Sequence, residues 1–146
     1  MTTADRLRET EKFLHAKIPL TRAMEVRVAG DDEHQLTLTA PLSANHNHLG
    51  TAFGGSLAAL AMLTGYALLW LELGDRAAHI VISESTLQYR RPVRGDLMAT
   101  CRRPENLAAF RETFAAKGKA RLQLQVEIES EGETAVVFSG TYVAKR

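Results

Sequence analysis

The chain has 146 residues, one cysteine and a formal net charge of +1 at pH 7. This length suits one ordinary domain with one hydrophobic core, so we predict a single domain over residues 1–146. The near-neutral charge gives no overall field for binding nucleic acid, and the single Cys101 excludes an internal disulfide bond. The N-terminus lacks the cationic start and apolar run of a signal peptide, which predicts a cytoplasmic protein.

The charge is unevenly distributed along the chain. The segment from Arg90 to Arg121 holds nine Lys or Arg residues against three acidic ones, while the segments on either side are net negative. A local basic region of this kind suits a phosphate-bearing small molecule or an acidic carrier protein. A solvated surface of mixed charge is the alternative interpretation.

The first third of the chain predicts one helix and a hairpin. Thr3 or Asp5 is expected to cap the helix, and Pro19 is expected to end it. Apolar and polar residues then alternate over residues 24–28 and again over residues 35–40, as in half-buried strands. The Gly-Asp-Asp sequence between these two segments reads as a turn, so the two strands form a hairpin.

The most unusual segment runs from Gly50 to Leu71 and contains no charged residue. Its apolar residues fall on every face of a helix, which is typical of a helix buried all round or of a membrane span. The strand-like segments that follow need an apolar partner, so we expect the buried helix of a soluble domain. The helix is expected to start near Phe53 and to end before Gly74.

The start of this helix is chemically distinctive. Gly54 and Gly55 have no Cβ, so backbone or ligand can approach closely. The first turn of a helix also has N–H groups without internal partners, which can polarise a carbonyl or hold an anion. The alternative is that the two glycines only allow the helix to pack against a neighbouring strand.

The rest of the chain predicts four more strands and one short helix. The third strand, residues 79–90, is expected to place Ile82 and Glu84 on a mostly polar face that meets a partner or lines a cleft, opposite Val81, Leu87 and Tyr89. Cys101 is expected to be a buried thiol in the fourth strand. The remaining predicted elements are a strand over 97–103, a helix between Pro104 and Gly118, and strands over 121–129 and 134–144. The whole pattern is α+β.

At this point the residues resemble a known family. The run Asn-His-Leu-Gly-Thr-Ala-Phe-Gly-Gly-Ser-Leu from Asn47 to Leu57, with Tyr-Arg-Arg-Pro from Tyr89 to Pro92, resembles the YiiD C-terminal type of thioesterase domain. Such domains also occur at the C-terminus of some bacterial acetyltransferases of the GNAT type. The resemblance covers nearly the whole chain, and it implies a hotdog fold, in which an antiparallel sheet wraps around one long central helix.

The better-understood relatives, the PaaI-type acyl-CoA thioesterases, imply a site at the start of that helix. Their Asn falls on Asn47, their Gly-Thr step on residues 50–51 and their glycine pair on residues 54–55. Their His falls on Phe53, and their catalytic carboxylate falls on Met62. Neither Phe53 nor Met62 can act as nucleophile or general base.

Three alternatives account for the absence of a base at these positions. Glu84 is expected to approach the helix start of a partner subunit, because that strand does so in hotdog dimers. His48 or His46, which flank Asn47, is the second source of a base. The third alternative is that the protein binds thioesters without hydrolysing them.

The remaining roles follow from the chemistry of thioester hydrolysis. The N–H of Gly55 is expected to stabilise the oxyanion, and Asn47 to position water or the thioester carbonyl. Phe53 is expected to line the mouth of the acyl slot, and Thr51 and Gly54 to contact substrate.

The exit of the third strand is expected to bind the carrier. Arg90, Arg91 and Arg94 suit the phosphates of coenzyme A or the acidic helix of a carrier protein. No metal or cofactor is expected beyond the coenzyme A or phosphopantetheine of the substrate, and neither nucleic acid nor membrane is an expected partner. An unpaired strand edge predicts a homodimer or a dimer of dimers.

The predicted function is therefore hydrolysis of acyl-CoA or acyl carrier protein thioesters. A non-catalytic module that binds the same thioesters is the alternative, and a dehydratase or hydratase of the same fold is a third.

Overall fold

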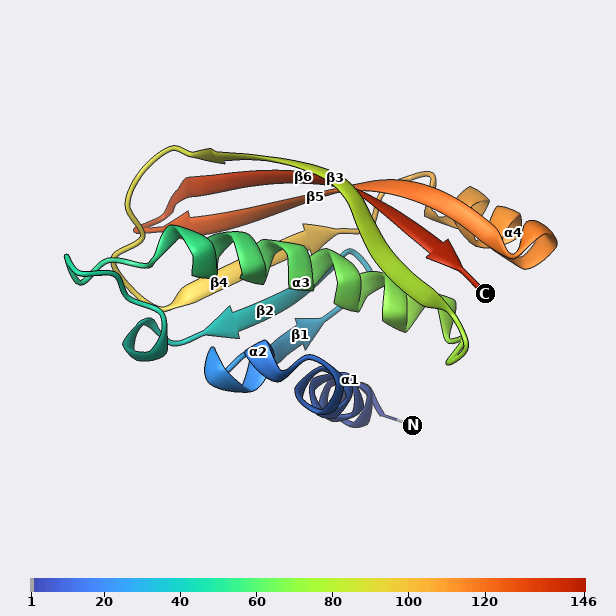
Figure 1. Ribbon diagram of the computed structural model, residues 1–146, viewed down its shortest axis with the longest axis horizontal. Helices are drawn as coiled ribbons and strands as arrows, with labels where there is room; N and C mark the ends of the chain where they lie inside the picture. The colour runs from blue at the N-terminus through green and yellow to red at the C-terminus, as the bar shows by residue number, and fades with distance from the viewer. Residues whose placement is uncertain (1) are drawn as a thin grey trace.

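The computed structural model describes residues 2–146 and shows a curved antiparallel sheet that wraps around one long helix (Figure 1). The helices are α1 (Thr3–Lys17), α2 (Pro19–Ala23), the 3-10 helix η1 (Leu42–Ala44), α3 (Gly54–Leu73) and α4 (Leu107–Lys117). The strands are β1 (Arg27–Asp31), β2 (Gln35–Ala40), β3 (His79–Tyr89), β4 (Leu97–Arg102), β5 (Lys119–Ser130) and β6 (Glu133–Lys145). Their order in the sheet is β1-β2-β4-β5-β6-β3. The α+β hotdog architecture is confirmed.

The central helix α3 lies where the sequence predicts it. Phe53 is its N-cap, and Gly74 ends it in the left-handed conformation with φ of 61°. The helix is long and apolar enough to cross a membrane, but it packs against the sheet strands and α1 as a core helix. One face differs from the expectation of burial all round: Ala59, Met62 and Tyr66 are only half-buried in one subunit.

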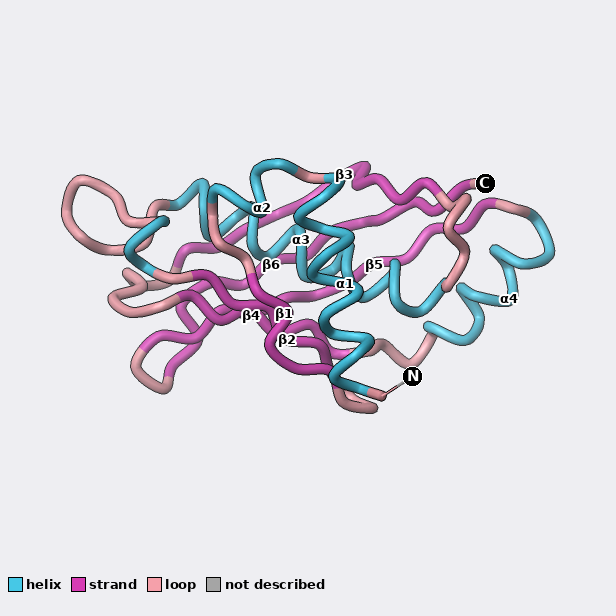
Figure 2. Tube along the Cα trace, turned by 90° about the horizontal axis from the view of Figure 1, so that it is seen from below, coloured by secondary structure: helices cyan, strands magenta, loops and turns pink. Residues whose placement is uncertain are grey.

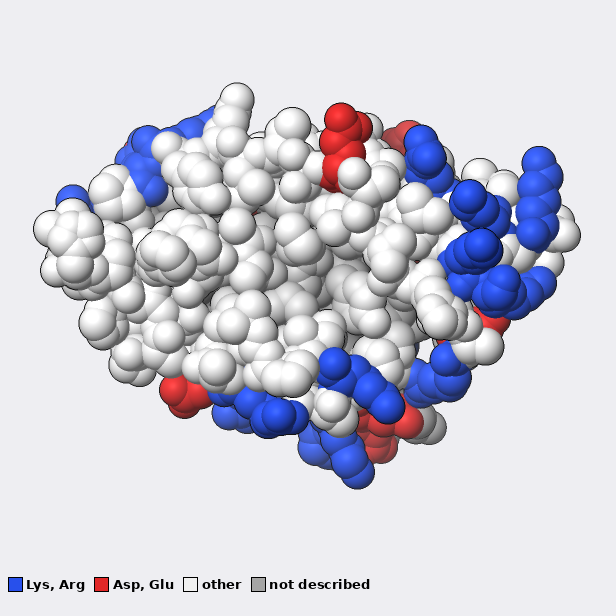
Figure 3. Space-filling model, viewed as in Figure 1, with Lys and Arg blue, Asp and Glu red and all other residues white. Residues whose placement is uncertain are grey.

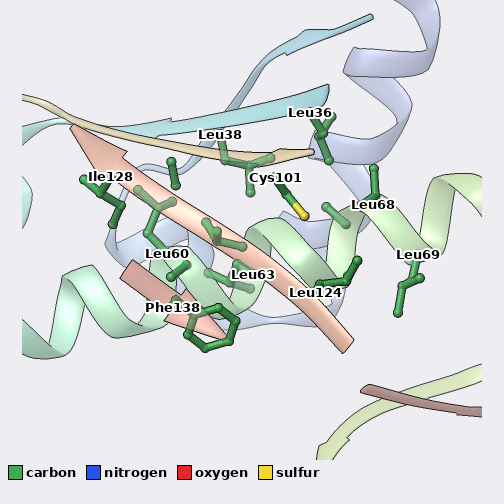
Figure 4. Packing of buried hydrophobic residues seen from close by; sticks show 14 of the residues in the cluster. Leu36, Leu38, Leu60, Leu63, Leu68, Leu69, Cys101, Leu124, Ile128 and Phe138 are labelled. Atoms are coloured by element: carbon green, nitrogen blue, oxygen red, sulfur yellow. The ribbon is translucent and has the colours of Figure 1, made fainter. Parts of the chain in front are cut away.

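The core fills the space between α3 and the sheet (Figure 4). Leu60 and Leu68 of α3 are fully buried against leucines, valines and isoleucines from the inward-facing positions of β2, β4, β5 and β6. Cys101 on β4 belongs to this core, as predicted, and burial raises its pKa to about 12. Each fully buried leucine contributes roughly 1.5–3 kcal/mol through removal from water.

One close contact locks α3 against β6. The Tyr142 hydroxyl donates a 2.7 Å hydrogen bond to the carbonyl oxygen of Met62, and the ring packs directly over Gly65. A Cβ at Gly65 would lie 2.4 Å from the Tyr142 hydroxyl oxygen and 2.6 Å from its ring carbon. Tyr142 is 1% exposed, so the ring has no room to move away.

Replacing Gly65 by alanine should therefore lower the free energy of unfolding by roughly 1–3 kcal/mol through overpacking. Chemical denaturation followed by tryptophan fluorescence measures the loss. Gly30→Ala is the matched control, because a Cβ there meets nothing within 4 Å. Equal midpoints for the two variants would show that the Tyr142 ring adapts.

Strand β3 is an edge strand with a bulge that changes which side chains face the helix. Ile82 pairs with Tyr142 and Glu84 pairs with Thr141, so Ser83 is the extra residue. Because Tyr142 points at α3, its neighbour Thr141 and the paired Glu84 point away from α3. The sequence prediction that grouped Ile82 with Glu84 is wrong, because a bulge shifts the alternation by one residue.

Beyond the bulge, β3 is poorly covered. Its outer edge has no partner strand among residues 2–146, and from Ser83 to Tyr89 every residue except Leu87 is exposed. A long, regular, unpaired edge is the feature by which strands associate with other chains.

The N-terminal region departs from the sequence prediction in its boundaries. The N-cap of α1 is Thr2, which forms a capping box with Asp5. Pro19 ends α1 as predicted but also starts the short helix α2, because proline suits the first position of a helix. Strand β1 begins at Arg27 rather than at residue 24, because Glu25 has a positive φ of 56° that interrupts the extended backbone.

A buried ionic network, which the sequence does not suggest, ties the end of α3 to the sheet. The Arg103 guanidinium donates to carboxylate oxygens of Glu72 at 2.5 Å and of Asp31 at 2.8 Å. These three side chains are 14%, 12% and 4% exposed, respectively. Although burial alone would lower the pKa of Arg103, these bonds raise it. Arg111, on the rim, also pairs with Glu72 at 2.8 Å.

Candidate functional site

The loop before α3 is held together by Asn47. Its Oδ1 accepts from the backbone N–H of Leu49 at 2.8 Å and of Thr51 at 3.2 Å. Its Nδ2 donates to Thr51 Oγ1 at 2.8 Å and to the Ala52 carbonyl at 3.4 Å. The Asn47 side chain therefore uses both polar atoms inside the loop, and Thr51 Oγ1 is one of its partners.

This loop leads into the start of α3, which has no side-chain cap. We define residues 53–56 as the α3 tip. The Phe53 N–H donates to the Asn45 carbonyl at 2.8 Å, and the Phe53 side chain gives no capping hydrogen bond. Within residues 2–146 the N–H groups of Gly54, Gly55 and Ser56 donate no hydrogen bond. These three donors, at the positive end of the helix dipole, can stabilise a developing negative charge.

Aromatic rings surround the tip. The Phe53 ring lies against Gly55, where an added Cβ would meet it at 2.4 Å. The Tyr89 ring lies beside Gly54, and its hydroxyl donates to the Gly54 carbonyl at 3.4 Å. Phe53 is 55% exposed and Tyr89 is 53% exposed, so the tip carries an uncovered apolar surface.

The connection between β3 and β4 lies beside the tip. The Ala52 N–H donates to the Val93 carbonyl at 2.8 Å, which joins the tip loop to this connection. Arg90 donates to Gln88 Oε1, and Arg91 pairs with Glu133. Figure 3 shows Lys and Arg atoms at the upper left, where β3 ends in Figure 1.

The structure thus brings most of the predicted site residues to one end of the molecule: Asn47, Thr51, Phe53, Gly54, Gly55, Arg90 and Arg91. His48 is exposed in the same loop. Glu84 is not brought to the tip of its own subunit, because it points to the outer side of the sheet. Tyr89 is a neighbour of the tip that sequence reasoning missed as a site residue, although it stands in the Tyr-Arg-Arg-Pro motif.

The α3 tip lies at the surface, where Phe53 and Gly55 are exposed. Of four hollows on the molecule, one of about 860 Å³ lies on the outer face of β2, β4 and β5, and three smaller ones lie near α1 and the end of α3. None of these four is lined by Gly54 or Gly55. Across residues 2–146 no group of three or more His, Cys, Asp or Glu side chains is placed to hold a metal ion.

Comparison with known families decides the class of protein. Residues 7–146 match the model of the family described as "Putative thioesterase (yiiD_Cterm)". The chain belongs to this thioesterase family. The yiiD_Cterm match includes the tip, the half-buried face of α3 and the edge strand β3, so all the parts of the candidate site lie within the matched residues.

Solved structures support the yiiD_Cterm assignment. A Chlorobaculum tepidum protein of unknown function is 31% identical, with a TM-score of 0.92 over 99% of this chain and 97% of that chain. A Shewanella oneidensis protein described as a "putative thioesterase" is 26% identical, with a TM-score of 0.89 over 98% of this chain and 99% of that chain. The PaaI protein of E. coli is 15% identical, with a TM-score of 0.66 over 99% and 96%, and shares the fold.

Proposed function

We propose that the protein hydrolyses acyl thioesters of coenzyme A or of an acyl carrier protein at the α3 tip, in the cytoplasm. The observation that carries the proposal is the set of three unpartnered N–H groups at Gly54, Gly55 and Ser56 in a thioesterase family member. Attack of water on the thioester carbonyl creates an oxyanion, and loss of one such donor typically costs ~10²–10³ in rate.

The acyl chain would lie along the half-buried face of α3. Gly55, Ala59, Met62 and Tyr66 follow one another at helical spacing on that face, about 16 Å from the first to the last. The face is apolar and starts at the tip. Met62, where the relatives have a carboxylate, would therefore contact the acyl chain rather than take part in the chemistry.

His48 is our candidate for the residue that activates the water. It is exposed on the loop that Asn47 organises, whereas Glu84 points away from α3 in its own subunit. A general base contributes typically 10²–10⁴-fold to the rate. Glu84 is the alternative to His48, and it would act only as a carboxylate presented to the tip of a second subunit.

A second copy of the chain would complete the site. The β3 edge is unpaired, and Phe53 and Tyr89 are exposed beside it. Antiparallel pairing of two β3 edges gives a two-fold dimer and covers these rings. Size-exclusion chromatography with light scattering should give at least twice the 16.1 kDa of the chain; a 16.1 kDa species would count against a shared site.

Binding without hydrolysis is the second candidate function. Phe53 and Met62 favour it, because they occupy the positions of the relatives' His and carboxylate and carry no proton-transfer group. In that case acyl-CoA would bind at the tip and stay intact.

Release of free thiol from acyl-CoAs of several chain lengths separates these functions. We expect turnover by the wild-type protein, a loss of at least 10²-fold in His48→Gln, and an unchanged rate in the matched variant Glu84→Gln. A loss confined to Glu84→Gln would move the base to the partner's strand. Binding of acyl-CoA without any thiol release would replace the enzyme proposal by the binding module.

A further inference from the structure

Two lysines and a histidine form a row across three strands at the end of the sheet opposite the tip. The register places Lys119 of β5 opposite Lys145 of β6, and Lys145 opposite His79 of β3. All three are exposed and share the outer face of the sheet. Like charges directly opposite each other destabilise a sheet, so folding alone gives no reason for this row.

Further cations extend the row into a basic patch, which we define as Lys117, Lys119, Arg121, Lys145 and His79. Lys117 ends α4 next to the start of β5, and Arg121 shares the outer face with Lys119. In the described part of the chain, none of the five takes part in an ion pair. Figure 3 shows Lys and Arg atoms gathered on the right, around α4 and the C-terminus of Figure 1.

The neighbouring row on the same face holds one cation, Arg121, and two valines. Arg121 pairs with Val143, and Val143 pairs with Val81, which is 59% exposed. The two rows together place cations beside the exposed Val81 and the half-buried Val143, on a surface about three strands wide, roughly 10 Å between the outer strands. An acidic partner would meet complementary charge and apolar area on this surface.

The shape also favours a protein over a small anion. None of the four hollows described above is lined by a residue of the basic patch. A small phosphate group needs converging donors, whereas an acidic helix can lie across a flat cationic face. Because the chain as a whole has a net charge of only +1, the attraction would be local and would orient the partner.

We propose that the basic patch docks an acidic protein that carries the acyl thioester, which makes this protein selective for protein-bound over coenzyme A-bound substrates. The identity of the docked protein as the acyl carrier rests on the proposed function. Within one chain the patch lies towards α4 and the C-terminus, at one end of the molecule (Figure 2). The tip lies at the start of α3, at the other end of this helix of about 30 Å (Figure 1).

The proposed dimer removes this separation. Antiparallel pairing of two β3 strands sets the start of one strand beside the end of the other. The basic patch of one subunit then lies next to the tip of its partner, and next to the partner's Arg90 and Arg91. A carrier docked on the outer face would thus lie at the end of the sheet nearest the partner's tip, and its flexible acyl-bearing arm would pass around that end to reach the site on the inner face.

The test combines one double charge reversal with three substrates. Lys119→Glu/Lys145→Glu should lower kcat/KM for an acyl carrier protein thioester at least 10-fold at low salt. The same variant should leave kcat/KM unchanged for the same acyl group on coenzyme A and on uncharged N-acetylcysteamine. Lys12→Glu/Lys17→Glu is the matched control, because it makes the same charge change on exposed residues of α1.

Binding is measured independently of catalysis. Fluorescence anisotropy of labelled apo acyl carrier protein should show a Kd at least 10-fold higher for the patch variant than for wild type, with a wild-type Kd that rises with salt. An equal loss on the coenzyme A and carrier substrates would assign the patch to phosphate groups and overturn the proposal. Unchanged binding would overturn it too. If no thioester is hydrolysed, the proposed function fails while the anisotropy result still decides the docking surface.

Discussion

Replacing Asn47 by alanine should lower kcat/KM for thioester hydrolysis about 100-fold, because the loop that positions the α3 tip would lose its internal hydrogen bonds. The N–H groups of Leu49 and Thr51 would lose their acceptor as well, which should cost about 0.5–1.5 kcal/mol of stability because both are at least partly open to water. Steady-state kinetics with acyl-CoA and denaturation curves of the same samples measure the two effects.

Asn47→Asp separates the roles of the two polar atoms of Asn47. The aspartate keeps the Oδ1 acceptor for the Leu49 and Thr51 N–H groups but lacks the Nδ2 donor, which serves Thr51 Oγ1 and the Ala52 carbonyl. If the Oδ1 acceptor holds the loop, the aspartate variant should keep most of the activity. A loss as large as that of Asn47→Ala would show that the Nδ2 donor is essential, and a wild-type rate in Asn47→Ala would remove the residue from the site.

Replacing Arg103 by alanine should have the largest effect on stability, about 3–5 kcal/mol. The change leaves the nearly buried carboxylates of Asp31 and Glu72 without their main cation, and removing one member of a buried ionic group costs this much. Urea denaturation should show the loss as a lower midpoint with an unchanged slope.

Arg111→Ala is the matched control for Arg103→Ala. Arg111 contacts Glu72 from a position that is 49% exposed, and pairs of that kind contribute at most about 1 kcal/mol. Similar losses in both variants would contradict the importance of burial. The combined variant Arg103→Met, Asp31→Leu, Glu72→Leu should regain much of the stability, because well-packed apolar groups can replace a whole buried ionic group.

Most of the fold could be predicted because its signals are local. The uncharged segment and Gly74 set α3 to within a residue or two, strict alternation predicted β5, and the Glu131-Gly132 turn predicted that β6 follows it. The errors arose where one residue overrides a pattern. The extra Ser83 reverses the faces of β3, and the positive φ of Glu25 delays the start of β1.

The site could be predicted in its location but not in its contacts. The motif identified Asn47 and the glycine pair, yet nothing local indicates that both polar atoms of Asn47 are used inside the loop. Long-range partners give no periodic signal. Arg103 and Asp31 are 72 residues apart, and Tyr89 reaches Gly54 from 35 residues away, so only the assembled chain shows these pairs.

The unpaired edge of β3 affects how newly made protein assembles. A newly synthesised monomer would present an eleven-residue template to any passing strand, so assembly competes with aggregation. The proposed dimer would also link stability to protein concentration, so the melting temperature should rise as the sample is concentrated. The protein would therefore be less stable in cells that produce little of it than in cells that produce much.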